Sequence, residues 1–246
     1  MKQRRRRVLG VLLIAIAIAI MNLTSVRPEP ASPTSAPPPE PAAPASTAEP
    51  PTPTGHAEPL ALASTVLETL PVKGRAPKTD YRRVQFGDGW ILVGNCDTRN
   101  TILNRDLTDV TLTGCKVATG KLTDPYTGKQ IDFQRGPSSS TLIQIDHVVA
   151  LSNAWQTGAQ LLTLEQRIAF ANDPLELLAV DGDANQAKGD GDAATWLPAN
   201  KAFRCQYVAR QIAVKAKYQL WVTQAEKDAM QRVLGECPEQ RVPGVK

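Results

Sequence analysis

The spacing of apolar residues changes along this chain, and the change predicts strands in some segments and helices in others. Alternating apolar and polar residues are typical of half-buried strands, whereas apolar residues three or four positions apart are typical of amphipathic helices. The strands expected on this basis are a segment after Trp90, a hairpin over 110–122, and runs over 130–133, 142–149 and 175–180. A turn signal, Asp124-Pro-Tyr-Thr-Gly128, follows the hairpin.

Helices are predicted by apolar spacing together with suitable capping residues. A short amphipathic helix is expected over 60–70, and Asp97 is a suitable N-cap for a helix that reaches Leu107. The residues expected to cap the later helices are Ser152, Thr163, Asn200 and Thr223. Residues 181–192 are rich in aspartate and glycine and predict a polar turn. The pattern as a whole predicts an α+β domain with its helices concentrated toward the C-terminus.

Residues 1–26 have the pattern of an export signal or of an N-terminal membrane anchor. Basic residues precede Val8, and a nearly unbroken apolar run then reaches Met21. This run is short for a spanning helix, which needs about 20 apolar residues, so a cleaved signal and a retained anchor both remain open. In either case the cationic end stays inside. The rest of the chain is expected to be secreted or anchored to the cell membrane with the domain outside.

Residues 27–58 predict a disordered linker, because they are mostly proline, alanine, serine, threonine and glutamate. Eleven of the chain's 20 prolines lie between Pro28 and Pro53. Such a segment buries too little apolar surface to offset its chain entropy. Residues 59–246 are then long enough to form one domain with a sizeable core.

The net charge of +4 overstates how basic the domain is. Six of the 28 basic residues and three of the 24 acidic residues precede Gly55, which leaves 22 basic against 21 acidic side chains from Gly55 onward. Proteins that bind nucleic acid without sequence preference usually carry a clear basic surplus. The near-neutral balance therefore counts modestly against tight nucleic-acid binding.

The four cysteines predict two disulfides, because an exported domain meets an oxidising environment. Three connectivities are possible. We favour Cys96–Cys115 and Cys205–Cys237, since each pair spans one expected supersecondary unit, and each loop would contribute roughly 3 kcal/mol. A zinc site is the less favoured alternative, because no Cys-x-x-Cys spacing occurs.

His147 is the one histidine of the expected domain, since His56 lies in the linker. It follows Asp146 at the end of an expected strand, and the next strand leads to Asn185. This order would bring Asp146, His147 and Asn185 together at one end of a small sheet. Histidine is suited to general-base chemistry near neutral pH, and carboxylate and amide oxygens are ligands that Mg²⁺ accepts. Lys188, one helical turn after Asn185, is expected to face a phosphate.

Several short motifs accompany these residues. They are Cys96-Asp-Thr-Arg-Asn100, Asp124-Pro-Tyr-Thr-Gly128, Ile145-Asp-His-Val-Val-Ala-Leu151, Phe170-Ala-Asn-Asp-Pro174, Asn185-Gln-Ala-Lys188 and Asp192-Ala-Ala-Thr-Trp-Leu-Pro198. Together they make the chain resemble, from about Gly87 to Cys237, the bacterial HNH endonuclease family whose domain forms the C-terminal part of GmrSD-type restriction endonucleases.

This resemblance implies a ββα-metal (His-Asn-His) nuclease core with flanking strands and C-terminal helices. It implies that His147 is the general base and that Asp146 and Asn185 hold a divalent metal ion, Mg²⁺ first and Mn²⁺ second. The middle asparagine of the family pattern is expected after Pro174, where this chain has Glu176. Either Asn172 takes that place, or Glu176 plays a different role.

The resulting hypothesis is an exported, metal-dependent endonuclease that hydrolyses DNA, with RNA as a second substrate. Its site residues are His147, Asn172, Glu176 and Lys188 for catalysis, and Asp146 and Asn185 for the metal. The membrane is involved only through a retained N-terminal anchor, and no protein partner is inferred.

Two alternatives remain open. One is a degenerate nuclease scaffold that binds nucleic acid or the cell surface, which the near-neutral charge and Glu176 favour. The other is a calcium-stabilised domain, because Asp181-x-Asp183-x-Asn185 resembles the start of a calcium loop. Gln186, however, stands where such a loop requires glycine.

Overall fold

The computed structural model describes residues 60–137, 139 and 141–244. All of them belong to one compact unit. The expected export segment and linker lie outside the described residues. Within the described ranges, no helix has both the length and the apolar character needed to cross a membrane.

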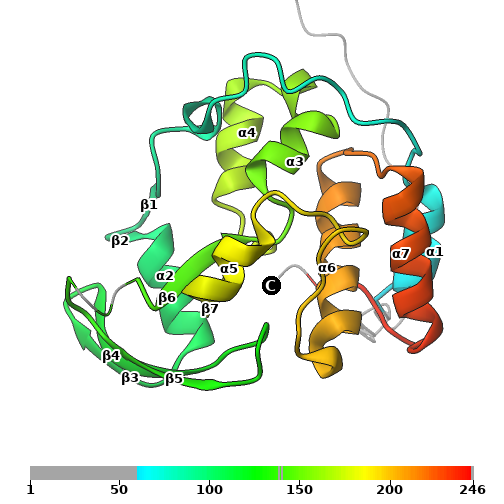
Figure 1. Cartoon of the computed structure of the whole chain (residues 1–246). Coiled ribbons are helices and arrows are strands. Elements are labelled where there is room, and N and C mark those ends of the chain that lie inside the picture. The colour runs from blue at the N-terminus through cyan, green and yellow to red at the C-terminus, as the bar shows by residue number, and fades with distance from the viewer. Residues whose placement is uncertain (1–59, 138, 140, 245–246) are drawn as a thin grey trace, which may run out of the picture. The chain divides into compact units, whose positions relative to one another are not determined.

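The described part of the chain is a mixed α and β domain, as the sequence predicts (Figure 1). Its strands are β1 Leu92–Val93, β2 Cys96–Asp97, β3 Thr108–Thr113, β4 Lys116–Thr123, β5 Gln130–Gln134, β6 Ile143–His147 and β7 Leu177–Asp181. Its α-helices are α1 Ala63–Thr69, α2 Thr98–Asp106, α3 Leu151–Gln156, α4 Leu164–Ala171, α5 Gly182–Lys188, α6 Arg204–Lys217 and α7 Gln224–Gly235. Short 3₁₀ helices are η1 Arg83–Phe86, η2 Ala159–Leu161 and η3 Lys201–Phe203.

The strands form three small antiparallel sheets: β1–β2, β3–β4–β5 and β6–β7. In the last sheet Ile143 lies opposite Asp181, and His147 lies opposite Leu177. Helices α3 and α4 intervene between β6 and β7 in sequence, and α5 follows β7 directly. Figure 1 shows α5 lying against the β6–β7 pair, and α1, α6 and α7 grouped on the other side of the domain.

The β6–β7 sheet lies between two hydrophobic clusters. The smaller cluster contains Leu177 and Ala179, together with residues of α2 and β4. The larger contains Leu178 and Val180, together with residues of α1, α3, α6 and α7. Because successive side chains of a strand point to opposite faces, β7 is buried on both sides. This explains why its sequence is a continuous apolar run rather than an alternating one.

Three of the expected helix caps are confirmed. The Asp97 carboxylate accepts a hydrogen bond from the Asn100 N–H at 2.7 Å, and Thr163 and Thr223 each form a complete capping box. Two expectations are wrong. Ser152 lies inside α3, where its hydroxyl donates to Asp190 instead of capping. Asn200 precedes η3, and its amide donates to the Pro125 carbonyl, so it does not cap α6.

The expected polar turn over 181–192 is also wrong in its first half, because Gly182–Lys188 form helix α5. Asp181 is the N-cap of this helix and accepts a hydrogen bond from the Ala184 N–H at 2.8 Å. A Cβ atom at Gly182 would lie 2.4 Å from the Thr141 carbonyl oxygen, so this close approach requires glycine. The segment that resembled a calcium loop is therefore a capped helix start.

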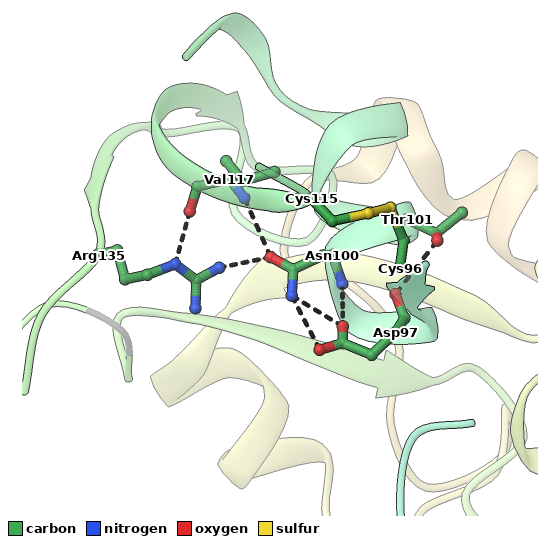
Figure 2. The surroundings of a disulfide bond; sticks show 7 residues. All are labelled: Cys96, Asp97, Asn100, Thr101, Cys115, Val117 and Arg135. Atoms are coloured by element: carbon green, nitrogen blue, oxygen red, sulfur yellow. Dashed lines mark hydrogen bonds between the residues drawn. A yellow bond between two sulfur atoms is a disulfide. The ribbon is translucent and has the colours of Figure 1, made fainter. Parts of the chain in front are cut away.

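Both favoured disulfides are confirmed, as Cys96–Cys115 and Cys205–Cys237. Figure 2 shows the first, beside the buried side chain of Asn100. The Asn100 amide nitrogen donates to the Asp97 carboxylate, and its oxygen accepts from the Val117 N–H at 3.0 Å and from Arg135 at 2.5 Å (Figure 2). The Cys96–Asn100 motif is thus a structural junction that ties α2 to β4 and to the end of β5.

Candidate functional site

Asp146, His147 and Asn185 line one pocket of about 400 Å³, which we call the Asp146 pocket. The other residues that line it are Tyr81, Arg83, Gln144, Ile145, Ala150, Leu151, Ser152, Gln186, Gly189 and Asp190. The end of β6 supplies the acid and the histidine, and α5 supplies the asparagine. The structure therefore brings together the three residues that the sequence placed at one end of a small sheet.

The Asp146 carboxylate is buried and has a partner on each oxygen. One oxygen accepts from the Lys188 ammonium at 2.9 Å, and the other accepts from the Tyr126 hydroxyl at 2.5 Å. Burial raises the pKa of Asp146, while Lys188 and the Tyr126 hydrogen bond oppose that rise. Burial also raises the pKa of Tyr126 well above its ordinary value, so its hydroxyl stays a donor.

Lys188, which is expected to face a phosphate, lies in the last turn of α5 beside Asp146. Its side chain is fully buried, and its ammonium donates to the Asp146 carboxylate and, at 2.8 Å, to the His147 carbonyl. A buried ammonium is stable only when it is paired and hydrogen-bonded. Lys188 therefore ties α5 to the end of β6, and a direct contact with phosphate remains a prediction.

His147 is buried, and its Nε2 atom lies 3.0 Å from the Ala171 carbonyl oxygen. A carbonyl oxygen can only accept a hydrogen bond, so Nε2 carries the hydrogen and Nδ1 keeps its lone pair. Burial is the main reason, and the nearby positive charge of Arg83 the second, that the pKa of His147 is lowered to about 3. The imidazole is consequently neutral near pH 7, in a defined tautomer.

The remaining polar groups of the Asp146 pocket are held in place. The Asn185 amide nitrogen donates to the Gln144 side-chain oxygen at 2.9 Å, which leaves the Asn185 oxygen as an acceptor. Asp190 accepts from the Ser152 hydroxyl at 2.9 Å and from Lys78 at 3.1 Å, and these bonds lower its pKa. Among the described residues, no three histidine, cysteine or acidic side chains are grouped as a metal site.

Glu176 and Asn172 are the two candidates for the middle position of the family pattern, and each accepts a backbone hydrogen bond, Glu176 from Val149 and Asn172 from Ile91. Both oxygens of the buried Glu176 carboxyl lie 3.2 Å from the Val149 N–H, just after His147. Burial raises the pKa of Glu176 well above its ordinary value. Asn172 follows Ala171, the partner of His147, and accepts hydrogen bonds from the Ile91 N–H and the Thr98 hydroxyl.

A second pocket of about 430 Å³, which we call the Trp90 pocket, adjoins the first. It is lined by Arg83, Val84, Phe86, Gly87, Asp88, Gly89, Trp90, His147, Leu151 and Ala171. The Trp90 and His147 rings are nearly parallel, with an interplanar angle of 9° and centroids 5.7 Å apart. Arg83, His147 and Leu151 line both pockets.

Three residues at or beside the site, Tyr126, Arg83 and Trp90, were not predicted from the sequence. Tyr126 belongs to the turn motif at 124–128, and that motif is the one sequence feature that could have identified it as a site residue. The turn is docked on the site because the Asp124 carboxylate accepts a hydrogen bond from the Asp181 N–H at 2.9 Å. Arg83 and Trp90 lie far from His147 in sequence, and nothing in the local pattern indicates their approach.

Comparison with known proteins places these residues in a family context. The family model described as GmrSD restriction endonucleases, C-terminal domain, matches residues 97–233. An uncharacterized secreted protein of Arthroderma benhamiae is 39% identical over 178 residues, which cover 71% of this chain and 84% of that protein. No solved structure matches the chain. Residues 97–233 include all six site residues expected from the sequence, whereas Arg83 and Trp90 precede this range.

Proposed function

Because this chain belongs to the family of GmrSD restriction endonuclease C-terminal domains, we propose that it is an exported, metal-dependent endonuclease of the HNH type. It hydrolyses phosphodiester bonds of DNA, with RNA as a second substrate. The observation that carries the proposal is the pocket in which a neutral histidine of defined tautomer meets Asp146 and Asn185. The β6–β7 pair followed by α5 serves as the ββα-metal core.

Asp146 and Asn185 are the residues that would hold the divalent ion, Mg²⁺ or Mn²⁺. An ionised carboxylate offers about four lone-pair positions, and Lys188 and Tyr126 use two of them. The Asn185 oxygen is also available, because the amide nitrogen makes the bond to Gln144. Mg²⁺ commonly takes only one or two protein carboxylates and keeps several waters, so this donor set fits. When bound, the ion supplies positive charge for the phosphoryl and leaving oxygens.

His147 is the general base. The Ala171 carbonyl holds Nε2 in its protonated form, so Nδ1 takes the proton from the attacking water. Glu176 and Asn172 are positioning residues in this scheme. Glu176 binds the backbone that follows His147, and Asn172 binds Ile91 beside the Trp90 pocket. Lys188 positions Asp146 by its buried ion pair.

Export is part of the proposal because independent features agree with it. The A. benhamiae relative is named a secreted protein, and all four cysteines of this chain are paired in disulfides. Disulfides of this kind are maintained in oxidising compartments. The N-terminal segment that would direct export is expected from the sequence alone.

The test is plasmid nicking by the full-length chain with Mg²⁺, comparing the wild type with His147→Ala. We expect the substitution to lower the rate by at least about 100-fold, in the range of lost general-base catalysis. The matched control is His56→Ala, which removes the other histidine of the chain and should leave the rate unchanged. Thermal unfolding of each variant shows whether it is folded. Full activity of a folded His147→Ala variant would contradict the proposed role of His147 as general base.

A second candidate, a nuclease scaffold that only binds, is favoured by one observation. Both Asp146 oxygens already have partners inside the protein, so this carboxylate is stabilised without an ion. This candidate predicts that folded wild-type protein binds nucleic acid or cell-surface material and cleaves nothing with Mg²⁺ or Mn²⁺. Its binding would also survive His147→Ala.

A further inference from the structure

The Trp90 pocket adjoins the proposed cleavage site, and the hydrolytic scheme leaves it without a role. We propose that it binds one unpaired nucleobase of the substrate, next to the phosphodiester bond that is cleaved. The preferred substrate class is therefore single-stranded or locally unpaired nucleic acid. This inference rests on the proposed nuclease function for the identity of the ligand, but it concerns binding rather than hydrolysis.

The walls of the pocket suit a flat, largely apolar ring. The Trp90 ring is stacked on the His147 ring, so a base would stack on this pair and not between its rings, and Val84, Phe86 and Leu151 supply apolar surface. Every nucleobase has a π face, and stacking on an aromatic side chain is a common way to hold an unpaired base. The volume of about 430 Å³ is in the range of small-ligand sites.

The Trp90 wall is held rigidly. The Ile91 N–H donates to the Asn172 side-chain oxygen at 3.0 Å, and the Asn172 amide nitrogen donates to the Ile168 carbonyl at 3.1 Å. These bonds fix the backbone immediately after Trp90 to the end of α4. A preorganised aromatic wall loses less entropy when a ligand binds than a mobile one.

Arg83 connects the Trp90 pocket with the Asp146 pocket. It lines both, and among the residues that the structure describes its side chain makes no hydrogen bond or ion pair. A guanidinium with no internal partner can donate two hydrogen bonds at once to the oxygens of a phosphate. A phosphate in the Asp146 pocket and its attached base in the Trp90 pocket would therefore both lie beside Arg83 and His147.

Asp88 offers a hydrogen-bond acceptor to a base in the Trp90 pocket. It is exposed at the rim of the pocket, between Gly87 and Gly89. A carboxylate accepts hydrogen bonds from the amino groups on base edges.

The charge balance of the domain also favours recognition of bases over a general attraction to the phosphate backbone. From Gly55 onward, 22 basic residues face 21 acidic ones, so the domain gains little from a general attraction to the phosphate backbone. Affinity must then come more from contacts with the bases. Bases of a duplex are stacked and paired, and reaching a pocket requires that they leave the helix.

The test is fluorescence anisotropy with the full-length chain in EDTA, so that binding is measured without cleavage. The probes are a labelled single strand, its duplex, and the same strand with abasic sites in place of its central bases. We expect the single strand to bind at least about tenfold more tightly than the duplex or the abasic strand, as loss of base stacking implies. Equal binding of the three probes, or binding of none, would overturn the proposal.

Two substitutions locate the effect. Trp90→Leu removes the aromatic face and should weaken single-strand binding by about 5- to 100-fold, whereas Trp90→Phe keeps a ring and should stay close to the wild type. Equal affinities of folded Trp90→Leu and wild type would reject this pocket. If Trp90→Leu does not fold, the comparison of the abasic strand with the normal strand on wild-type protein tests the proposal in its place.

The nicking assay separates this inference from the nuclease proposal. Base-dependent binding without cleavage in Mg²⁺ would keep the base pocket and reject the nuclease. Metal-dependent cleavage by protein that binds abasic and normal strands equally would reject the base pocket and keep the nuclease.

Discussion

At the scale of single residues, the partners of Asp146 decide how it can act. Lys188 and Tyr126 each bind one of its oxygens, and all three groups are buried. An unpaired buried carboxylate would take up a proton and become a poor metal ligand. The adjacent ammonium instead favours the ionised form. In the proposed mechanism, Lys188 would therefore help to keep Asp146 ionised for a cation without having to touch the substrate.

Replacing Lys188 should therefore cost much more stability than replacing an exposed lysine. We expect Lys188→Met to lower the free energy of unfolding by about 3 kcal/mol or more, because it leaves a buried carboxylate without its charge partner. The matched control is Lys78→Met, which breaks the half-exposed ion pair with Asp190 and should cost less than about 1 kcal/mol. Urea unfolding of both variants measures the difference, and similar small losses would contradict the assigned role.

The sequence predicted some of these residues and missed others for a physical reason. Asp146, His147 and Asn185 lie next to recognisable strand ends, so local pattern was enough to place them together. The position of Lys188 was not predictable, because burial of a lysine depends on the groups that surround it in three dimensions. Arg83 and Trp90 approach the site only through tertiary contacts.

At the scale of elements, α5 shows where a sequence pattern misleads. Its residues are mostly polar, so they lack the apolar stripe that usually identifies a helix. The helix is stabilised instead by the Asp181 cap and by the Lys188 bonds to the end of β6. The expected hairpin and the Thr163 and Thr223 capping boxes were predictable because each depends on neighbouring residues only.

The start of α5 should be sensitive to a single methyl group. In Gly182→Ala the new Cβ would lie 2.4 Å from the Thr141 carbonyl oxygen, so α5 and the segment just before β6 must separate, and we expect a loss of about 1–3 kcal/mol. Gly235→Ala is the matched control, because nothing lies within 4 Å of the added carbon at the end of α7. It should be neutral or stabilising by up to about 1 kcal/mol. Thermal unfolding that shows equal effects would contradict this account of α5.

At the scale of the whole molecule, the site depends on segments that are distant in sequence. The Asn172 side chain binds Ile91 and Thr98, which are 81 and 74 positions away. These bonds bring the segment that carries Trp90 to the end of α4. The two hydrophobic clusters on either side of β6–β7 hold His147 against Ala171. The fold class was predictable from composition and periodicity, but such pairings were not.

The central claim, that this chain is a metal-dependent nuclease, is tested most directly by titrating a divalent ion. The measurement is the rate of plasmid nicking by the full-length, disulfide-bonded chain, first in EDTA and then with increasing Mg²⁺ or Mn²⁺. We predict no cleavage in EDTA and a saturable rate that returns when the ion is restored, because Asp146 and Asn185 bind it. Cleavage that persists undiminished in EDTA, or folded protein that cleaves with neither ion, would contradict the account.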